Sequence, residues 1–161
     1  MAVLMTIKGL MVDPVTNNPI VVLHDEQGER VLPIWVGTFE ANAIALQLEN
    51  VAPPRPMTHD LLRQIITELK AIVVRVTVTE VKDATFFAVI ELAVNGERVL
   101  VDSRPSDGIA LALRAKAPIY VEEIVLEQAR SQESDENRPD TDRLQRWLES
   151  IDPDELGKYK M

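Results

Sequence analysis

The chain has 161 residues, of which 46% are hydrophobic and 27% are charged, and it contains no cysteine. This composition is typical of a globular domain with its own core, and it excludes disulfides, thiolate metal sites and a cysteine nucleophile. The formal net charge is −9, with −3 over residues 1–121 and −6 over residues 122–161, so neither part has the basic footprint of a strong nucleic-acid binder.

Two features of the sequence bear on location. No apolar run approaches the roughly 18–20 residues that a membrane-spanning helix needs. The N-terminal residues MAVLMTIKGL lack the small-residue cleavage site of a secretory signal. We therefore expect a cytoplasmic protein without a membrane partner.

The first part of the chain predicts three strands and then two helices. Alternating apolar residues between turn residues indicate strands at 2–12, 20–24 and 30–36. Thr38 is expected to cap a helix that runs to about residue 50. The proline-rich segment 52–56 predicts an extended loop, after which Thr58 is expected to cap a helix over 59–69.

The second part repeats this order. Strands are predicted at 72–81, 85–94 and 97–102, and Asn95-Gly96 is a typical two-residue hairpin turn. Ser106 is expected to cap an apolar helix over 107–116. A short strand at 119–121 and a short helix over 122–129 follow. The predicted organisation is a domain over 1–130, an acidic linker over 131–141 and a helical tail over 142–161, with an amphipathic helix at 142–151.

Two short segments recur in the same order along the chain. GERVL occurs at 28–32 and again at 96–100, and IALxL occurs at 44–48 and again at 109–113. Chance is the alternative to duplication, because Ala/Leu-rich helices resemble one another and GER is an ordinary turn. A duplicated unit of hairpin, strand and helix predicts an α+β fold, with a mixed and mostly antiparallel sheet covered by helices.

Two longer blocks carry a family resemblance. Residues 32–62, LPIWVGTFEANAIALQLENVAPPRPMTHDLL, and residues 102–126, DSRPSDGIALALRAKAPIYVEEIVL, resemble the bifunctional nuclease domain family. The resemblance covers about residues 2–130. It implies a fold of mixed sheet and helices, and the DNase and RNase activity of some members. It does not supply a set of catalytic residues.

The first candidate site is the start of the second helix. Arg55 is suited to pair with a phosphate, and His59 is suited to act as a general acid or base. Asp60 is suited to hold a metal or to orient His59. The alternative is that Thr58 and Asp60 only start the helix and that His59 is a surface side chain.

The second candidate site is the segment from Asp102 to Asp107. Asp102 is a candidate catalytic residue and metal ligand, Arg104 and Ser106 are candidate phosphate-binding residues, and Asp107 is a candidate catalytic residue at a helix start. The alternative is a structural ion pair between Arg104 and Asp107. The repeat adds Glu40 as a third candidate and a metal ligand. The hypothesis is that five residues converge on one pocket: Glu40, His59, Asp102, Arg104 and Asp107.

The family resemblance, together with these candidate residues, implies a nuclease, a hydrolase that cuts phosphodiester bonds in DNA or RNA with little sequence preference. A divalent metal, Mg or Mn, is expected to assist, although no spacing matches a metal motif. The alternative is a non-catalytic module that binds an anionic ligand or a protein at its helix N-termini. We also expect a homo-oligomer, through an exposed strand such as 30–36, and a protein partner for the 142–151 helix.

Overall fold

The structure is a computed structural model that describes residues 1–135 of the chain, and side chains are described as far as residue 130. The predicted tail over 142–161 and most of the predicted linker lie outside these residues. The seven strands are β1 (Ala2–Val12), β2 (Pro19–Asp25), β3 (Val31–Trp35), β4 (Ala71–Lys82), β5 (Thr85–Val94), β6 (Glu97–Ser103) and β7 (Ile119–Glu122). The helices are α1 (Thr38–Leu48), α2 (Thr58–Glu68), α3 (Pro105–Ala115) and α4 (Glu123–Asp135).

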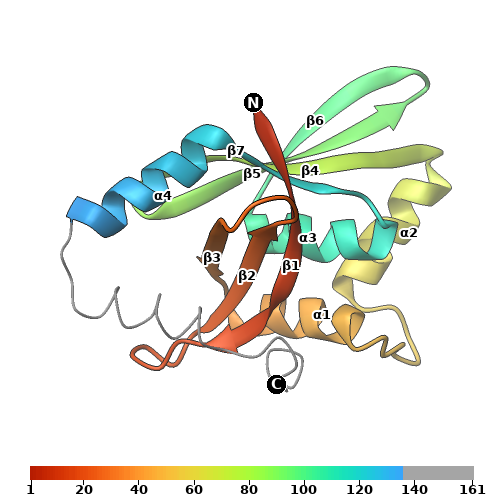
Figure 1. Ribbon diagram of the computed structural model, residues 1–161. Helices are drawn as coiled ribbons and strands as arrows, with labels where there is room; N and C mark the ends of the chain where they lie inside the picture. The colour runs from red at the N-terminus through yellow and green to blue at the C-terminus, as the bar shows by residue number, and fades with distance from the viewer. Residues whose placement is uncertain (136–161) are drawn as a thin grey trace.

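The strands form a single mixed sheet in the order β3-β2-β1-β7-β4-β5-β6 (Figure 1). Strands β1–β3 and β4–β6 are two antiparallel meanders. Strand β7 lies between them, antiparallel to β1 and parallel to β4. The predicted α+β fold with a mixed, mostly antiparallel sheet is therefore confirmed.

Each meander is followed by a helix, α1 in the first case and α3 in the second. The recurring IALxL segments lie on these two helices. Their first residues, Ile44 on α1 and Ile109 on α3, are both fully buried. This is the element order that the repeat predicts. Common origin of the two halves stays a prediction.

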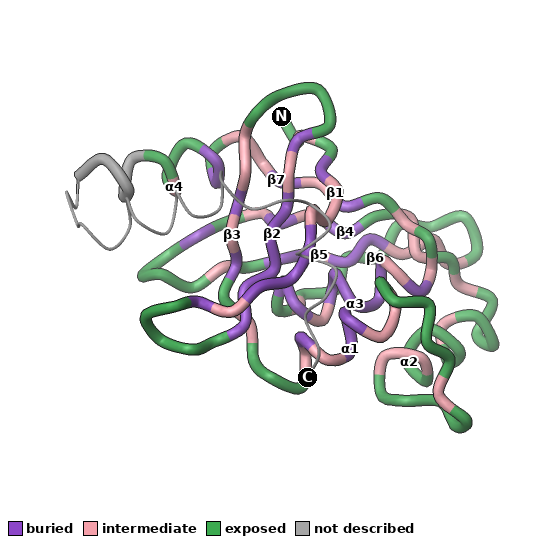
Figure 2. The backbone as a smooth tube through the Cα atoms, turned by 60° about the horizontal axis from the view of Figure 1, so that its bottom comes forward, coloured by how far each residue is buried: buried purple, intermediate pink, exposed green. Residues whose placement is uncertain are grey.

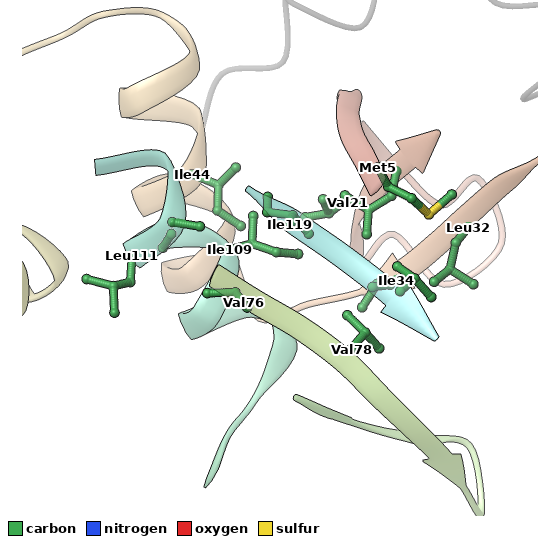
Figure 3. Packing of buried hydrophobic residues seen from close by; sticks show 14 of the residues in the cluster. Met5, Val21, Leu32, Ile34, Ile44, Val76, Val78, Ile109, Leu111 and Ile119 are labelled. Atoms are coloured by element: carbon green, nitrogen blue, oxygen red, sulfur yellow. The ribbon is translucent and has the colours of Figure 1, made fainter. Parts of the chain in front are cut away.

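The core lies between the sheet and the helices. Helix α3 contacts α1, α2, β4 and β5, while α4 contacts β4 and β7. Figure 2 shows buried backbone concentrated in the central strands, α1 and α3, whereas α2 has no buried residue. The side chains that meet in this core include Met5, Val21, Leu32, Ile34, Ile44, Val76, Val78, Ile109, Leu111 and Ile119 (Figure 3).

Gly108 brings the start of α3 close to the sheet. A Cβ atom at this position would lie 2.7 Å from Cγ1 of Val76 on β4 and 3.2 Å from Oγ of Ser103 on β6. The first distance is shorter than a carbon–carbon contact allows, so only glycine fits without displacing a neighbour. This close approach fixes the position of Asp107, the adjacent residue.

The expected helix starts need correction. Thr38, Thr58 and Ser106 are not N-caps, because the capping residues are Gly37, Met57 and Arg104. In α2, the carboxylate of Asp60 instead accepts the backbone N–H of Met57 at 3.1 Å. In α3, Pro105 occupies the first helical position, where a missing N–H costs nothing and φ is already suitable. A side chain one residue inside a helix cannot act as its N-cap.

Helix α4 also differs from its expected bounds. It continues to Asp135, beyond the predicted end near residue 129 and into the segment expected to be linker. The polar composition of that segment favoured a loop, although the Gln and Glu within it are good helix formers. Within the described residues, no helix is long and apolar enough to cross a membrane.

Candidate functional site

The N-terminal turns of α1, α2 and α3 bring four predicted residues together. Nε2 of His59 lies 2.9 Å from Oδ1 of Asp107, and Nε of Arg104 lies 2.9 Å from Oδ2 of the same carboxylate. Nη2 of Arg104 donates in turn to Oε1 of Glu40 at 2.8 Å. The chain His59–Asp107–Arg104–Glu40, here named the His59 network, joins residues that are far apart in the sequence.

The hydrogen bond to Asp107 assigns the tautomer of His59. A carboxylate only accepts hydrogen bonds, so Nε2 carries the proton and Nδ1 of the neutral ring keeps its lone pair. Only 12% of the His59 side chain is exposed, so packing restricts its rotation. A ring that is oriented by a carboxylate and has one basic nitrogen available is suited to general base chemistry.

The charges in the network favour the ionised carboxylates. Burial raises the pKa of Asp107, but the hydrogen bonds from His59 and Arg104 together outweigh burial and leave the pKa below its ordinary value. Glu40 also has a lowered pKa, first through its own backbone N–H and then through Arg104. The hydrogen bonds that Arg104 donates to Asp107 and Glu40 raise the pKa of Arg104, so the guanidinium stays charged.

Local sequence explains why these groups face each other. Arg104 caps α3, so its side chain leaves the helix at the same end as Asp107 in the first turn. Glu40 lies in the first turn of α1, where a negative charge suits the helix dipole. The ion pair of Arg104 with Asp107, predicted as the structural alternative, therefore exists and is one link of a larger network.

Asp60 belongs to a separate pair. Its Oδ1 atom accepts Nε of Arg114 at 2.7 Å, and the role of orienting His59 is filled by Asp107. Burial raises the pKa of Asp60, and the backbone N–H of Met57 and the side chain of Arg114 bring it below the ordinary value. Asp60 is therefore held as an anion by its own partners.

Sequence reasoning missed Arg114. Its side chain is 3% exposed, and it also donates to the backbone carbonyls of Ala110 and Ala43, both at 2.9 Å. The pair thus ties α3 to both α1 and α2. The signal in the sequence was a single cation within the apolar run of the α3 helix, a pattern that favours a buried and paired charge.

Besides Asp60, three predicted residues lie outside the His59 network. Asp102 is exposed on β6, and because neighbouring residues of a strand point to opposite faces, it faces away from Ser103 and α3. Arg55 is exposed in the proline-rich loop. Ser106 is buried in the first turn of α3, with 6% of its surface exposed.

The arrangement does not offer an evident metal site. The described residues contain no group of three or more His, Asp or Glu side chains that could hold a metal ion. Glu40 and Asp107 are instead bridged by the Arg104 guanidinium, whose positive charge opposes a cation at the same oxygens. The assignment of Glu40 and Asp102 as metal ligands stays a prediction.

Comparison with known proteins identifies the family. Residues 21–134 match the family model of the bifunctional nuclease domain, which is more than half of the chain. The chain belongs to the bifunctional nuclease domain family. This match confirms the resemblance seen in the sequence. The matched region includes all four residues of the His59 network.

The relatives fall into two groups. An uncharacterized protein of Mycobacterium tuberculosis is 39% identical over 157 residues, which cover 92% of this chain and 94% of the relative. Bifunctional nuclease 1 of Oryza sativa subsp. japonica is 28% identical over 68% of this chain, and Bifunctional nuclease 1 of Arabidopsis thaliana is 32% identical over 65%. The matched regions span 34% and 33% of these plant proteins, so the similarity to them is confined to the bifunctional nuclease domain.

Proposed function

We propose that this chain is a nuclease that hydrolyses phosphodiester bonds in DNA or RNA with low sequence specificity, and that the His59 network is its site. Membership of the nuclease family supports the kind of reaction. The observation that carries the site is the hydrogen bond between His59 and Asp107, next to the exposed guanidinium of Arg104. This arrangement combines an oriented base with a cation suited to bind phosphate.

In the proposed reaction, Nδ1 of His59 accepts a proton from a water molecule as the water oxygen bonds to phosphorus. The bond from phosphorus to the leaving sugar oxygen breaks, and that oxygen takes a proton from solvent. Asp107 positions the imidazole and stabilises the imidazolium that forms, as a carboxylate does in a catalytic triad.

Arg104 is the proposed phosphate-binding group. A guanidinium has five N–H donors, and the network uses Nε and one N–H of Nη2, so the Nη1 group has no partner among the described residues. The side chain is 63% exposed and therefore accessible to a polymer. Binding through phosphate positions a strand without reading its bases, which favours low sequence specificity.

A divalent metal, Mg or Mn, remains an expectation. The network does not resemble a set of metal ligands, since the Arg104 guanidinium lies between its carboxylates. Asp102 and Arg55, on the exposed surface, and Ser106, in the first turn of α3, remain candidates for supporting contacts.

The test is cleavage of labelled single-stranded RNA and double-stranded DNA by the purified chain, in EDTA and then with Mg²⁺ or Mn²⁺. His59→Gln is purified in parallel, and His24→Gln is the matched control because His24 bonds to Thr6 on β1. Cutting that is lost only in His59→Gln supports the proposal. Cutting that persists in His59→Gln contradicts the site, and no cutting by the parent chain favours the binding module.

The proposed homo-oligomer has two features in its favour. Strands β3 and β6 are the edges of the sheet, and α2 exposes the apolar side chains of Leu61, Leu62 and Ile65. Exposed apolar patches and free edges commonly mark association surfaces. Sedimentation at micromolar concentration tests this proposal, since a clean monomer contradicts it.

A protein partner for the 142–151 helix would bind outside the described residues. A cytoplasmic location remains an expectation.

A further inference from the structure

A second polar site lies beside the His59 network. An open cavity of about 420 Å³ is bounded by the end of α1, the proline-rich loop and α2, with Asp60 and Arg114 among its lining residues. The cavity is also lined by Gln47, Asn50, Pro53, Pro54, Arg63 and Gln64. The reaction proposed above does not use any of these six.

Three amide side chains face this cavity without a partner. Gln47, Asn50 and Gln64 line it, and the side chains of all three make no hydrogen bond to any described residue. An amide group both donates and accepts, and Asn and Gln are the side chains that pair with adenine through two hydrogen bonds. The chemistry of the cavity therefore matches the edge of a nucleobase.

The remaining lining suits the flat face of a base. The guanidinium of Arg63 makes no hydrogen bond to a described residue, and its charge contributes to the lowered pKa of Asp60 nearby. A guanidinium plane stacks on unpaired bases in RNA-binding proteins. Pro53 and Pro54 add apolar rings to the wall.

Helix α3 links this cavity to the network. Asp107 and Arg114 are seven residues apart on α3, which is two turns or roughly 10 Å along its axis. A stacked strand rises about 3.4 Å per nucleotide, so three nucleotides cover this length. A strand with one phosphate at Arg104 could therefore place a base about three nucleotides away in the cavity.

We propose that the cavity is a nucleobase subsite and that the substrate is consequently single-stranded nucleic acid. A base can enter such a cavity only if it is unstacked and unpaired, and a duplex would first have to extrude it at an energetic cost. The inference rests on the proposed nuclease function for its link to cleavage. The binding of a base can be measured without any cleavage.

The experiment titrates the full chain with adenosine in EDTA and follows backbone amide shifts by NMR, with ribose 5-phosphate as the comparison. Adenosine is expected to shift amides around Gln47 and Gln64. The double variant Gln47→Ala/Gln64→Ala should bind adenosine about tenfold more weakly. Alanine is favourable at both helical positions, so the fold should be retained. Gln128→Ala, on α4, is the matched control and should bind like the parent chain.

Cleavage provides the second measurement. The double variant should show a KM about tenfold higher on single-stranded RNA with kcat little changed, and the parent chain should prefer that substrate to a duplex of the same sequence. The subsite is refuted if adenosine shifts no cavity amide, or if ribose 5-phosphate alone reproduces the shifts. Equal KM for single strand and duplex refutes the substrate class.

The two proposals fail in different ways. If adenosine binds in the cavity but no substrate is cut, the nuclease function fails and the subsite stands. If cutting depends on His59 but neither adenosine binding nor KM depends on the two glutamines, the subsite fails and the nuclease function stands.

Discussion

Nε2 of His59, at the start of α2, lies 2.9 Å from Oδ1 of Asp107, at the start of α3. The two residues are 48 positions apart in the sequence, and the contact forms because α2 packs against α3. The structure thus turns two ordinary helix-start residues into an oriented pair. The first prediction concerns this pair.

Replacing Asp107 with Asn should reduce kcat by roughly 100-fold or more. The imidazolium of His59 would lose the negative charge beside it, and the imidazole ring would lose its fixed orientation. Steady-state cleavage rates measure this. Asp83→Asn, in the exposed turn between β4 and β5, is the matched control and should cut at the parent rate. An Asp107→Asn variant with unchanged kcat would show that the pair is only structural.

Replacing Arg104 separates charge from geometry. Lys retains the positive charge but cannot span Asp107 and Glu40 with a planar fork. We expect Arg104→Lys to raise KM for an oligonucleotide about tenfold and Arg104→Ala to raise it further. If both variants bind the substrate as tightly as the parent, Arg104 does not contact phosphate.

Arg114 should matter for stability more than any surface arginine. Replacing it with Met keeps the volume but leaves Asp60 without its cation and removes the side-chain hydrogen bonds to the carbonyls of Ala43 and Ala110. The free energy of unfolding should fall by about 3–5 kcal/mol, as measured by urea denaturation. Arg63→Met, an exposed change on α2, should alter it by less than about 0.5 kcal/mol.

Gly108→Ala tests the close approach of α3 to the sheet. The added methyl group would overlap Cγ1 of Val76, and we expect a loss of about 1–3 kcal/mol in spite of the better helix propensity of Ala. In a Val76→Ala background the overlap is removed, so the same substitution should cost much less. A double-mutant cycle by thermal or urea unfolding measures the difference, and simple additivity would contradict the proposed overlap.

The fall in the free energy of unfolding at acid pH should depend on Asp107. Its pKa is lowered in the folded protein, so the unfolded chain binds more protons as the pH falls below about 4. The ionised Asp107 therefore stabilises the folded protein at any pH above the ordinary pKa of Asp. This stabilisation is lost as the pH falls through the lowered pKa that Asp107 has in the folded protein. Unfolding measured between pH 2 and 6 should show a shallower decline for Asp107→Asn, and an unchanged slope would argue against this assignment.

Local patterns predicted most of the fold. Each strand agreed to within two residues at either end, because alternation and turn residues such as Asn95-Gly96 act over short distances. The cap of α1 and the start of α2 were placed one residue late and the start of α3 two residues late, while the start of α4 was placed one residue early. A capping side chain is recognised by residue type, but the cap is decided by backbone geometry, and Pro105 shifted the start of α3.

The site was only partly predictable. His59, Arg104 and Asp107 were singled out from the chemistry of loops and helix starts, and Glu40 from the repeat. Their connection depends on how three helices pack. Arg114 was missed because nothing in its neighbours shows that Asp60 reaches it from another helix. Asp102 was singled out from the same segment as Arg104, and the alternation of β6 places its side chain on the face opposite to Ser103, away from α3.

The position of β7 has a consequence for how this chain acquires its shape. Ala2 of β1 pairs with Glu122 of β7, 120 residues later, and β7 also pairs with β4. On a ribosome the first meander would emerge long before the strand that joins it to the second. The two halves therefore share one sheet only late in synthesis, and contacts so distant in sequence are typical of slowly folding domains. Until then, β1 and β4 each have an unsatisfied edge that is open to aggregation or to capture by a chaperone.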